Sequence, residues 1–338
     1  MPETNRRWLL NARPEGRPGP DAFRLDEAPA PAPAEGEVLC RTLWLSLDPY
    51  MRGRMNAGKS YAKGVAPGEV MTAEVVAEVV ESRAPGFAPG DVVRAPGGWQ
   101  TRFALKAEAL APLRDWPLPV QTALGVLGMP GLTAYAALDA IARPAEGETV
   151  VVPAATGAVG SVFGQLAREK GARVVGVAGG PDKCAEAVDF YGFDACLDRR
   201  APGFADDLAA ACPDGVDVYA ELVGGPVSGA VLPLLNDHAR IPVIGLIAGY
   251  NATAPAEGPD RLPLLMRHVL TKRLRIEGFI VFDHEDRRPA FLRKVGALAK
   301  DGRLRYREDA VEGFENAPEA FLRLFDGANR GKLLVKVG

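Results

Sequence analysis

The stretch TVVVPAATGAVG, residues 149–160, decides how this chain folds. It opens with Thr149–Val152, an apolar run with the length and composition of a buried strand. A glycine-containing turn follows. Apolar residues then recur at the spacing of one helical face: Val159, Val162, Phe163, Leu166 and Ala167. Gly171 is placed to end that helix. The stretch therefore predicts a strand, a tight turn and an amphipathic helix.

The same alternation continues along the chain. Val174–Ala178, Val216–Val223 and Ile241–Ile247 are further strand candidates, and Lys183–Tyr191 is predicted to form a helix. Strands that alternate with helices imply a parallel sheet covered by helices on both faces. The predicted fold class is therefore α/β, with a doubly wound Rossmann domain over residues 125–303.

The rest of the chain has a different rhythm. Over residues 1–124, short apolar runs such as Glu74–Val80 are separated by Pro/Gly turns, which predicts a β-rich domain. Near residue 304 this rhythm returns. Asn316–Glu319 resembles a capping box that opens a helix, and Gly331–Val337 has the pattern of a final strand. We expect residues 304–338 to return to the first domain.

The glycine turn also suggests a ligand. Ala155, Gly157 and Gly160 match the dinucleotide fingerprint, with Ala in its first position. Glycines there let the backbone turn tightly and approach a pyrophosphate, which the helix N-terminus then stabilises. The alternative is a tight turn without a ligand. The strand before the turn and the amphipathic helix after it favour a bound dinucleotide.

The end of the second strand indicates which dinucleotide. NAD sites usually place an acid there to bind the ribose 2′-hydroxyl. Here the strand ends in Ala178-Gly179-Gly180, without an acid, and Lys183 follows. A missing carboxylate and a nearby cation suit a 2′-phosphate, so NADPH is the predicted cofactor. Arg199 and Arg200 are candidates for a second cation. The alternative for both arginines is a solvated surface residue, and for Lys183 a solvated residue in the first turn of a helix.

Composition excludes several classes of function. The 338 residues carry a formal net charge of −3, which gives no electrostatic case for nucleic acid or an anionic membrane. No apolar run reaches the ~20 residues of a membrane span, and none of the four cysteines forms a C-x-x-C pair. We expect a cytoplasmic protein with reduced thiols. None of the three histidines pairs with a Cys at ligand spacing, so we expect no catalytic zinc.

Longer motifs resemble one family over nearly the whole chain. The family is the zinc-independent medium-chain reductases, in the group of prostaglandin reductase and leukotriene B4 dehydrogenase. The motifs are Leu47–Gly53, Gly128–Tyr135, Ala154–Gly160, Val175–Lys183 and Glu312–Glu319. Three more resemble the bacterial NADPH-dependent curcumin reductases within that group: Gly192–Asp198, Ala239–Thr253 and Gly258–Met266.

The resemblance implies an architecture and an activity. It implies a chaperonin-10-like catalytic domain, a Rossmann domain, an active site in the cleft between them, and a homodimer whose Rossmann sheets meet edge to edge. The implied activity is reduction of the carbon–carbon double bond of α,β-unsaturated ketones and aldehydes, of the curcumin or 2-alkenal type. By position, the implied cofactor-binding residues are Gly157, Ala158, Val159 and Gly160 at the pyrophosphate; Gly179, Lys183 and Arg199 near the 2′-phosphate; Gly245, Leu246 and Tyr250 at the nicotinamide; Phe279, Ile280 and Val281 near the carboxamide; and Asn329 and Gly331, which close over the cofactor.

The mechanistic hypothesis is a 1,4-reduction. Hydride from NADPH reaches the β-carbon, and negative charge develops on the carbonyl oxygen of the enone. A neutral Tyr hydroxyl can donate a hydrogen bond to that oxygen. Tyr50 and Tyr250 are the candidates, and either can relay the proton to the α-carbon; the alternatives are domain packing for Tyr50 and cofactor positioning for Tyr250. Competing functions are quinone or 2-enoyl thioester reduction and, in another class, a catalytically silent NADPH-binding protein.

Overall fold

The computed structural model describes residues 3–255 and 260–338, and the chain divides into two compact units. One unit runs from the N-terminus to Leu124 and includes Glu308–Gly338, whereas the other is Gly125–Arg307. Part of the motif Gly258–Met266 (residues 258 and 259) lies outside the described residues. The chain thus leaves the first unit once and comes back to it at its C-terminal end.

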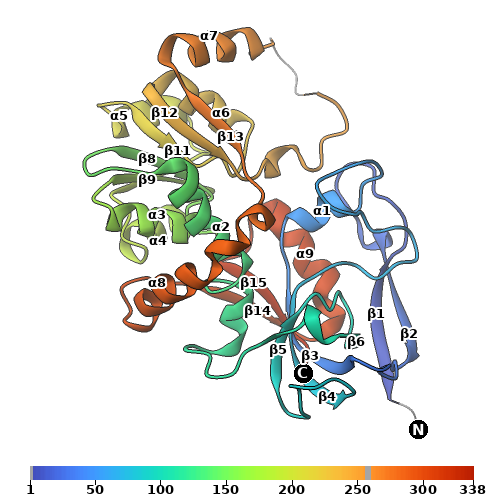
Figure 1. Ribbon diagram of the computed structural model, residues 1–338. Helices are drawn as coiled ribbons and strands as arrows, with labels where there is room; N and C mark the ends of the chain where they lie inside the picture. Colours follow the sequence, from blue (N-terminus) through green and yellow to red (C-terminus); the bar gives the residue numbers. More distant parts are fainter. Residues whose placement is uncertain (1–2, 256–259) are drawn as a thin grey trace. The chain divides into compact units, whose positions relative to one another are not determined.

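The first unit is built on β-strands. They are β1 (Thr4–Leu10), β2 (Phe23–Pro29), β3 (Glu37–Ser46), β4 (Val75–Ser82), β5 (Val92–Ala95), β6 (Arg102–Lys106), β7 (Ala111–Pro112), β14 (Glu308–Glu312) and β15 (Lys332–Lys336). The main sheet has the order β14-β15-β3-β4-β5-β7, with β6 paired to β3, while β1 and β2 pair with each other. The last strand of the chain therefore lies beside β3, antiparallel to it (Figure 1).

Two α-helices and an aromatic cluster accompany the strands in the described part of this unit. The helices are α1 (Tyr50–Arg54) and α9 (Ala317–Asp326). The Phe23 ring stacks on Trp99 at 5.5 Å, and Phe321 of α9 meets Trp99 edge-on at 5.5 Å. All three rings are buried, so this cluster fixes α9 within the hydrophobic core.

The predicted capping box of α9 is wrong, although the helix itself is where the pattern places it. The Asn316 side chain makes no cap hydrogen bond and instead donates to the Glu312 carbonyl at 2.8 Å. The reason is that a 3₁₀ turn, Phe314–Asn316, runs directly into the helix. The helix ends at Gly327, which adopts the left-handed conformation that glycine tolerates best.

The second unit is an open, parallel sheet with helices between its strands. Its strands are β8 (Thr149–Pro153), β9 (Arg173–Ala178), β10 (Ala195–Asp198), β11 (Val216–Tyr219), β12 (Leu235–Val243) and β13 (Arg275–Gly278). Its α-helices are α2 (Met129–Ala137), α3 (Gly160–Glu169), α4 (Pro181–Asp189), α5 (Phe204–Ala211), α6 (Pro226–Val231), α7 (Leu262–Lys272) and α8 (Arg288–Lys300). The strand order is β10-β9-β8-β11-β12-β13, and every pair is parallel. Numbered from its first strand, this is the 3-2-1-4-5-6 order of a dinucleotide-binding sheet, so the predicted fold class is confirmed.

The prediction for β12 needs a correction. The apolar run Ile241–Ile247 predicts a strand, but β12 begins at Leu235 and ends at Val243. The strand ends because the N–H groups of Ile244 and Gly245 both donate to the Glu221 carbonyl, at 2.9 and 3.1 Å, which turns the chain. The apolar residues after Val243 therefore belong to a loop at the carboxyl end of the sheet.

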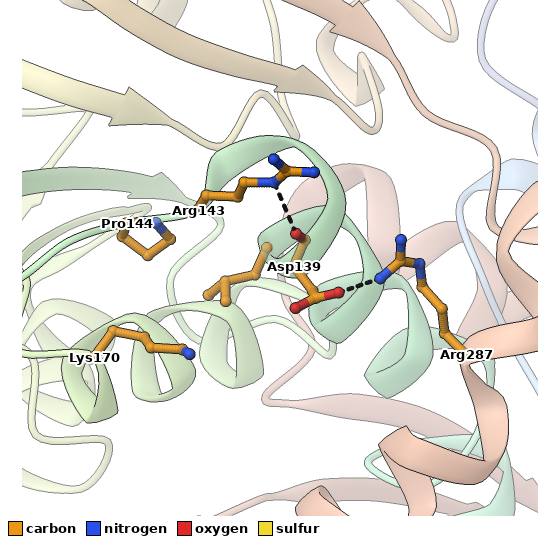
Figure 2. A pocket seen from close by; sticks show the side chains of 6 residues that line it. Asp139, Arg143, Pro144, Lys170 and Arg287 are labelled. Carbon is orange, nitrogen blue, oxygen red and sulfur yellow. Dashed lines mark hydrogen bonds and ion pairs between the residues drawn. The ribbon is translucent and has the colours of Figure 1, made fainter.

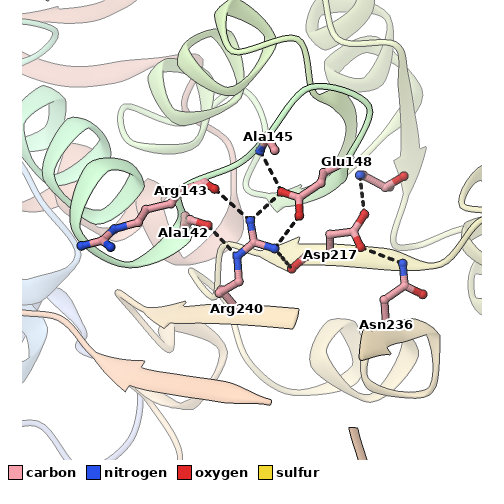
Figure 3. Close-up of polar contacts among 8 residues, drawn as sticks. Ala142, Arg143, Ala145, Glu148, Asp217, Asn236 and Arg240 are labelled. Carbon is pink, nitrogen blue, oxygen red and sulfur yellow. Dashed lines mark hydrogen bonds and ion pairs between the residues drawn. The ribbon is translucent and has the colours of Figure 1, made fainter. Parts of the chain in front are cut away.

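An arginine fixes the chain where it enters the central strand β8 (Figure 3). Arg240 of β12 donates to the carbonyls of Ala142 and Arg143 at 2.8 and 2.9 Å and pairs with both carboxylate oxygens of Glu148 at 2.7 and 2.5 Å. Arg143 has a left-handed backbone (φ 43°), which a non-glycine residue rarely adopts without support from its surroundings. The network thus sets the position from which β8 and the glycine turn follow.

Candidate active site

The glycine turn joins β8 to α3 and has room only for glycine at its key position. A Cβ on Gly160 would lie 2.4 Å from the Ala154 carbonyl oxygen, closer than any side chain tolerates. The turn is closed by the Gly157 N–H, which donates to the Ala154 carbonyl at 2.8 Å. The Ser161 hydroxyl donates to the Gly157 carbonyl at 2.7 Å. The first N–H groups of α3 therefore face a tight, small-residue turn, which suits a pyrophosphate.

Two arginines gather beside the end of β9. A Cβ on Gly179 would lie 3.4 Å from the Arg200 guanidinium carbon and 3.5 Å from a terminal nitrogen of Arg199. Lys183 is half-buried in the first turn of the next helix, α4. The structure thus brings Gly179 and both predicted arginines together, and Lys183 follows Gly179 by four residues in the chain. Positive charges placed in this way fit a phosphate.

One acid does lie near these cations, at the end of β10. The Asp198 carboxylate accepts the backbone N–H groups of Gly180 at 2.8 Å and Arg200 at 2.9 Å through one oxygen. The bond from the Arg200 N–H contributes most, followed by that from Gly180, and together they hold the pKa of Asp198 below its ordinary value. This carboxylate shapes the turn through its bonds to backbone N–H groups. The residue pattern does not reveal that role.

Glu221 holds two loops, one of which carries candidate residues, a role that the sequence patterns did not indicate. Its buried carboxylate accepts the N–H groups of Val223 at 3.0 Å and Gly224 at 2.7 Å, and the hydroxyls of Tyr219 and Ser228. The signal available in the sequence is a strand followed by an acid and the pair Gly224-Gly225. Glu221 holds the loop after β11 in one shape, and its carbonyl holds the loop after β12.

That second loop carries three predicted residues, Gly245, Leu246 and Tyr250. The Tyr250 hydroxyl lies 3.5 Å from the Leu246 nitrogen and accepts its N–H. A Cβ on Gly245 would lie 3.4 Å from the Leu222 carbonyl oxygen, so the two loops pack closely. Leu246 is 46% exposed, which leaves an apolar side chain at the surface beside Tyr250.

The segment directly after β13 carries Phe279, Ile280 and Val281. Like the loop after β12, it lies at the carboxyl end of the parallel strands. The Phe279 N–H donates to the Val243 carbonyl at 3.0 Å, and its ring stacks on His284 at 4.8 Å. Phe279 and Val281 are buried and Ile280 is half-buried, so this segment can meet a ligand mainly through its backbone. His284 thus has a packing role within the second unit.

The remaining predicted residues lie in the first unit, around a buried ion pair. The ammonium of Lys332 is 2.6 Å from Asp48 Oδ1 and donates to the Leu47 carbonyl at 2.8 Å. Just before this lysine, the Asn329 amide donates to the Gly331 carbonyl at 2.9 Å. The pair holds the turn that leads into α1, whose first residue is Tyr50.

Tyr50 is half-buried, with its ring 5.5 Å from the guanidinium carbon of Arg54. Within the described residues, 3–255 and 260–338, its hydroxyl forms no hydrogen bond. Burial raises the pKa of Tyr50 first of all, the carboxylates of Asp48 and Glu74 add to the increase, and Arg54 opposes it. The phenol is therefore neutral at ordinary pH and keeps its proton to donate.

The pocket in Figure 2 holds none of the predicted residues, and two residues that line it, Pro144 and Lys170, come shortly before β8 and β9 in the chain. Arg143 and Lys170 line it, and they follow the C-terminal ends of a π-helical turn and of α3. Cations there complement the partial negative charge of helix C-termini. Asp139 pairs with Arg287 across the same pocket.

In the described part of the chain, no three His, Cys, Asp or Glu side chains gather as a metal site would require. Among the described helices, none combines the length and the apolar character of a membrane span.

Comparison with known proteins gives the family. A model described as the N-terminal domain of oxidoreductases matches residues 6–113, and one described as zinc-binding dehydrogenase matches residues 158–296. The NADPH-dependent curcumin reductase of Escherichia coli is 52% identical, over 99% of this chain and 97% of its own length. This chain belongs to the zinc-independent medium-chain dehydrogenase/reductase family. The resemblance predicted from the motifs is confirmed.

Other members of the zinc-independent medium-chain family give the same picture. Prostaglandin reductase 1 of Bos taurus is 39% identical, over 97% of this chain and 98% of its own. The NADP⁺-dependent 2-alkenal reductase of Nicotiana tabacum is 41% identical, over 89% and 87%. A crystal structure of CurA from Vibrio vulnificus in complex with NADPH is 47% identical, with a TM-score of 0.96, over 98% of this chain and 99% of that one.

Proposed function

We propose that this protein is an NADPH-dependent reductase of the carbon–carbon double bond in α,β-unsaturated ketones and aldehydes. The observation that carries the proposal is the full-length similarity to three reductases, of curcumin, prostaglandins and 2-alkenals. Curcumin and 2-alkenals share a double bond conjugated to a carbonyl group. The physiological substrate of this chain belongs to that chemical class.

The chain's own residues fit the cofactor. The turn Gly157–Gly160 and the N-terminus of α3 would hold the pyrophosphate, and Lys183, Arg199 and Arg200 would hold the 2′-phosphate. When bound, NADPH supplies the hydride for the β-carbon of the substrate. The loop Gly245–Tyr250 and the backbone of Phe279–Val281 would orient the nicotinamide, and Asn329 and Gly331 would close over the cofactor.

Tyr50 is the better candidate for the donor to the carbonyl oxygen. Its hydroxyl makes no hydrogen bond within the described ranges, and burial raises its pKa, so that it keeps its proton to donate. A preorganised neutral donor stabilises the negative charge that builds on this oxygen as the double bond is reduced. Tyr250 then serves mainly to hold the loop after β12.

An assay of NADPH oxidation with a panel of substrates tests the function. The panel contains a curcuminoid, a 2-alkenal, a cyclic enone, a quinone and a 2-enoyl thioester. We expect the highest kcat/KM with the enones and the alkenal, and products that are saturated at the double bond with the carbonyl intact. Faster quinone or thioester turnover would favour those activities instead, and no turnover of any substrate would favour a silent NADPH-binding protein.

The cofactor preference is testable by removing the two arginines. Replacing Arg199 and Arg200 by Ala removes charge-assisted bonds worth about 1.5–3 kcal/mol each, of which solvent screens a part because both side chains are exposed. We expect the KM for NADPH to rise roughly 10- to 100-fold, while the KM for NADH, which lacks the 2′-phosphate, stays the same. Equal changes for both cofactors would show that these arginines do not read the phosphate.

We further propose a homodimer formed through the β13 edge of the second sheet. β13 is the last strand of that sheet, and its Ile276 is 40% exposed. On α7, one stripe at spacing i, i+4 and i+8 is also exposed: Leu262 58%, Met266 55% and Leu270 78%. Among the described strands, β13 has only β12 as a sheet neighbour, and α7 directly precedes it in the chain. An open strand edge and an apolar helical stripe suit pairing with a second copy.

Charge placed on this stripe tests the dimer. Replacing Met266 and Leu270 by Glu should halve the mass measured by light scattering on a sizing column, because two carboxylates would be buried in the interface. Val188→Glu, at an apolar residue 38% exposed on α4, is the matched control and should keep the wild-type mass. An unchanged mass for the double variant would place the interface elsewhere.

A cytoplasmic location completes the proposal. All four cysteines are free thiols, at positions 40, 184, 196 and 212. Chains that work in oxidising compartments commonly use disulfides for stability, and this one does not. Fluorescence of a C-terminal fusion in intact cells would test the location.

A further inference from the structure

Arg54 is a buried cation of the first unit. Its side chain is at the end of α1, and the residue is only 8% exposed. Within residues 3–255 and 260–338, its guanidinium forms one hydrogen bond, a long one of 3.5 Å to the Lys63 carbonyl. Among the residues that the structure describes, no Asp or Glu pairs with it. Burying a charge without an ion pair is costly, so this arginine requires an explanation.

Two aromatic rings enclose this guanidinium. Its central carbon lies 5.5 Å from the centre of the Tyr50 ring and 4.6 Å from that of Tyr61. Tyr50 precedes Arg54 by four residues, so both project from the same face of α1. The faces of both rings carry negative potential, which attracts a cation.

The chain after α1 is folded back to make this arrangement. The Val65 N–H donates to the Arg54 carbonyl at 2.7 Å, and a Cβ on Gly64 would lie 3.2 Å from the carbonyl oxygens of Arg54 and Asn56. This return places Tyr61 over the guanidinium, although Tyr61 itself is 53% exposed. The neighbouring Arg52 differs, since it donates to the Gly16 carbonyl at 2.8 Å and to the Asn56 side chain. Arg52 thus has backbone partners that account for its burial, whereas Arg54 has mainly tyrosine rings.

We propose that Arg54 is a positioning residue that acts through Tyr50. Its guanidinium holds the Tyr50 ring in place from one side and puts positive potential on the phenol, so that the hydroxyl donates more strongly as negative charge builds on the substrate oxygen. The inference rests on the proposed function, in which Tyr50 is that donor. Arg54 opposes the carboxylates of Asp48 and Glu74 at this phenol, in agreement with that role.

A double-mutant cycle on kcat tests the inference, with a 2-alkenal as substrate and saturating NADPH. Arg54→Met keeps the length of the side chain and removes the charge. We expect it to lower kcat roughly tenfold, the value of a desolvated cation–π contact, with the KM for NADPH unchanged. Arg54→Lys keeps the charge and should recover part of the loss. In a Tyr50→Phe background, Arg54→Met should have little further effect, because the hydroxyl it serves is gone.

Other outcomes separate the two proposals. If Arg54→Met lowers kcat by the same factor with and without the Tyr50 hydroxyl, Arg54 acts independently and the inference is overturned while the donor stands. Wild-type kcat in Arg54→Met overturns it as well. Wild-type kcat in Tyr50→Phe would overturn the donor and the inference together. Arg6→Met, which removes a cation 5.6 Å from the Phe314 ring in the same unit, is the matched control and should keep kcat. Thermal unfolding of each variant verifies that it is folded.

Discussion

Replacing Tyr50 by Phe is expected to lower kcat for an enone about 10²- to 10³-fold, the usual cost of removing one preorganised donor to an oxyanion. The ring and its contact with Arg54 remain, so the fold and the KM for NADPH should be unchanged. Tyr250→Phe should have a smaller effect on kcat, because in this assignment Tyr250 positions its own loop, whose Leu246 N–H its hydroxyl accepts, and is not the donor. Steady-state kinetics on both variants gives the comparison.

The pH dependence of kcat checks the same assignment. Because burial raises the pKa of Tyr50, the phenol stays protonated well above the ordinary value of about 10. We therefore expect no loss of kcat from Tyr50 ionisation between about pH 7 and 9. The matched control for the two tyrosine variants is Tyr306→Phe. Tyr306 is a half-buried tyrosine of the second unit and lies outside the predicted motifs. If Tyr50→Phe and Tyr250→Phe both retain wild-type kcat, the tyrosine-donor mechanism is wrong.

The sequence was most informative where the contacts that matter are local. In β8 and the glycine turn, a run of buried residues, a turn and a helical face follow one another within 149–160, and each is visible in the residue pattern. The sheet order follows from that alternation, because parallel strands with helical crossovers can be arranged in few ways. That Gly179 lies close to Arg199 follows too, because each comes directly after one of two adjacent strands, β9 and β10.

Sequence patterns were least informative about polar groups joined by the fold. Nothing near Lys332 in the chain indicates that it binds Asp48, because 284 residues separate the two. The surroundings of Arg54 could not be predicted, since its tyrosine neighbours depend on how the loop after α1 turns back. The end of β12 could not be predicted either. An apolar run continues through Ile247, and only the carbonyl of Glu221, from another strand, stops it.

The Lys332–Asp48 pair has the consequence for stability that is easiest to measure. The two side chains are 4% and 9% exposed, so either charge left without the other would be buried and unpaired. Breaking such a pair typically costs about 3–5 kcal/mol. Lys332→Met should therefore reduce the free energy of unfolding by that amount, and lower the urea midpoint of the first unit. Because the pair holds the turn before Tyr50, kcat should fall as well.

A matched control lies on the same strand. Lys336 is 43% exposed and 3.3 Å from Glu312, which is 74% exposed. An exposed pair of this kind contributes about 0–1 kcal/mol, so Lys336→Met should change the midpoint little. Combining Lys332→Met with Asp48→Asn should recover part of the loss, because no unpaired charge is then buried. Equal midpoints for Lys332→Met and Lys336→Met would contradict the importance of the buried pair.

The pH dependence of stability provides a second, independent measurement. Burial lowers the pKa of Lys332 and prevails over the Asp48 carboxylate, which raises it. The unfolded chain, in which the lysine has its ordinary pKa of about 10.5, therefore holds this proton more tightly than the folded protein does. Stability rises with pH wherever the unfolded state binds more protons. The contribution of Lys332 should thus increase as the pH rises from its folded-state pKa toward that ordinary value, and this slope should disappear in Lys332→Met. A slope of the same size in that variant would show that other groups cause it.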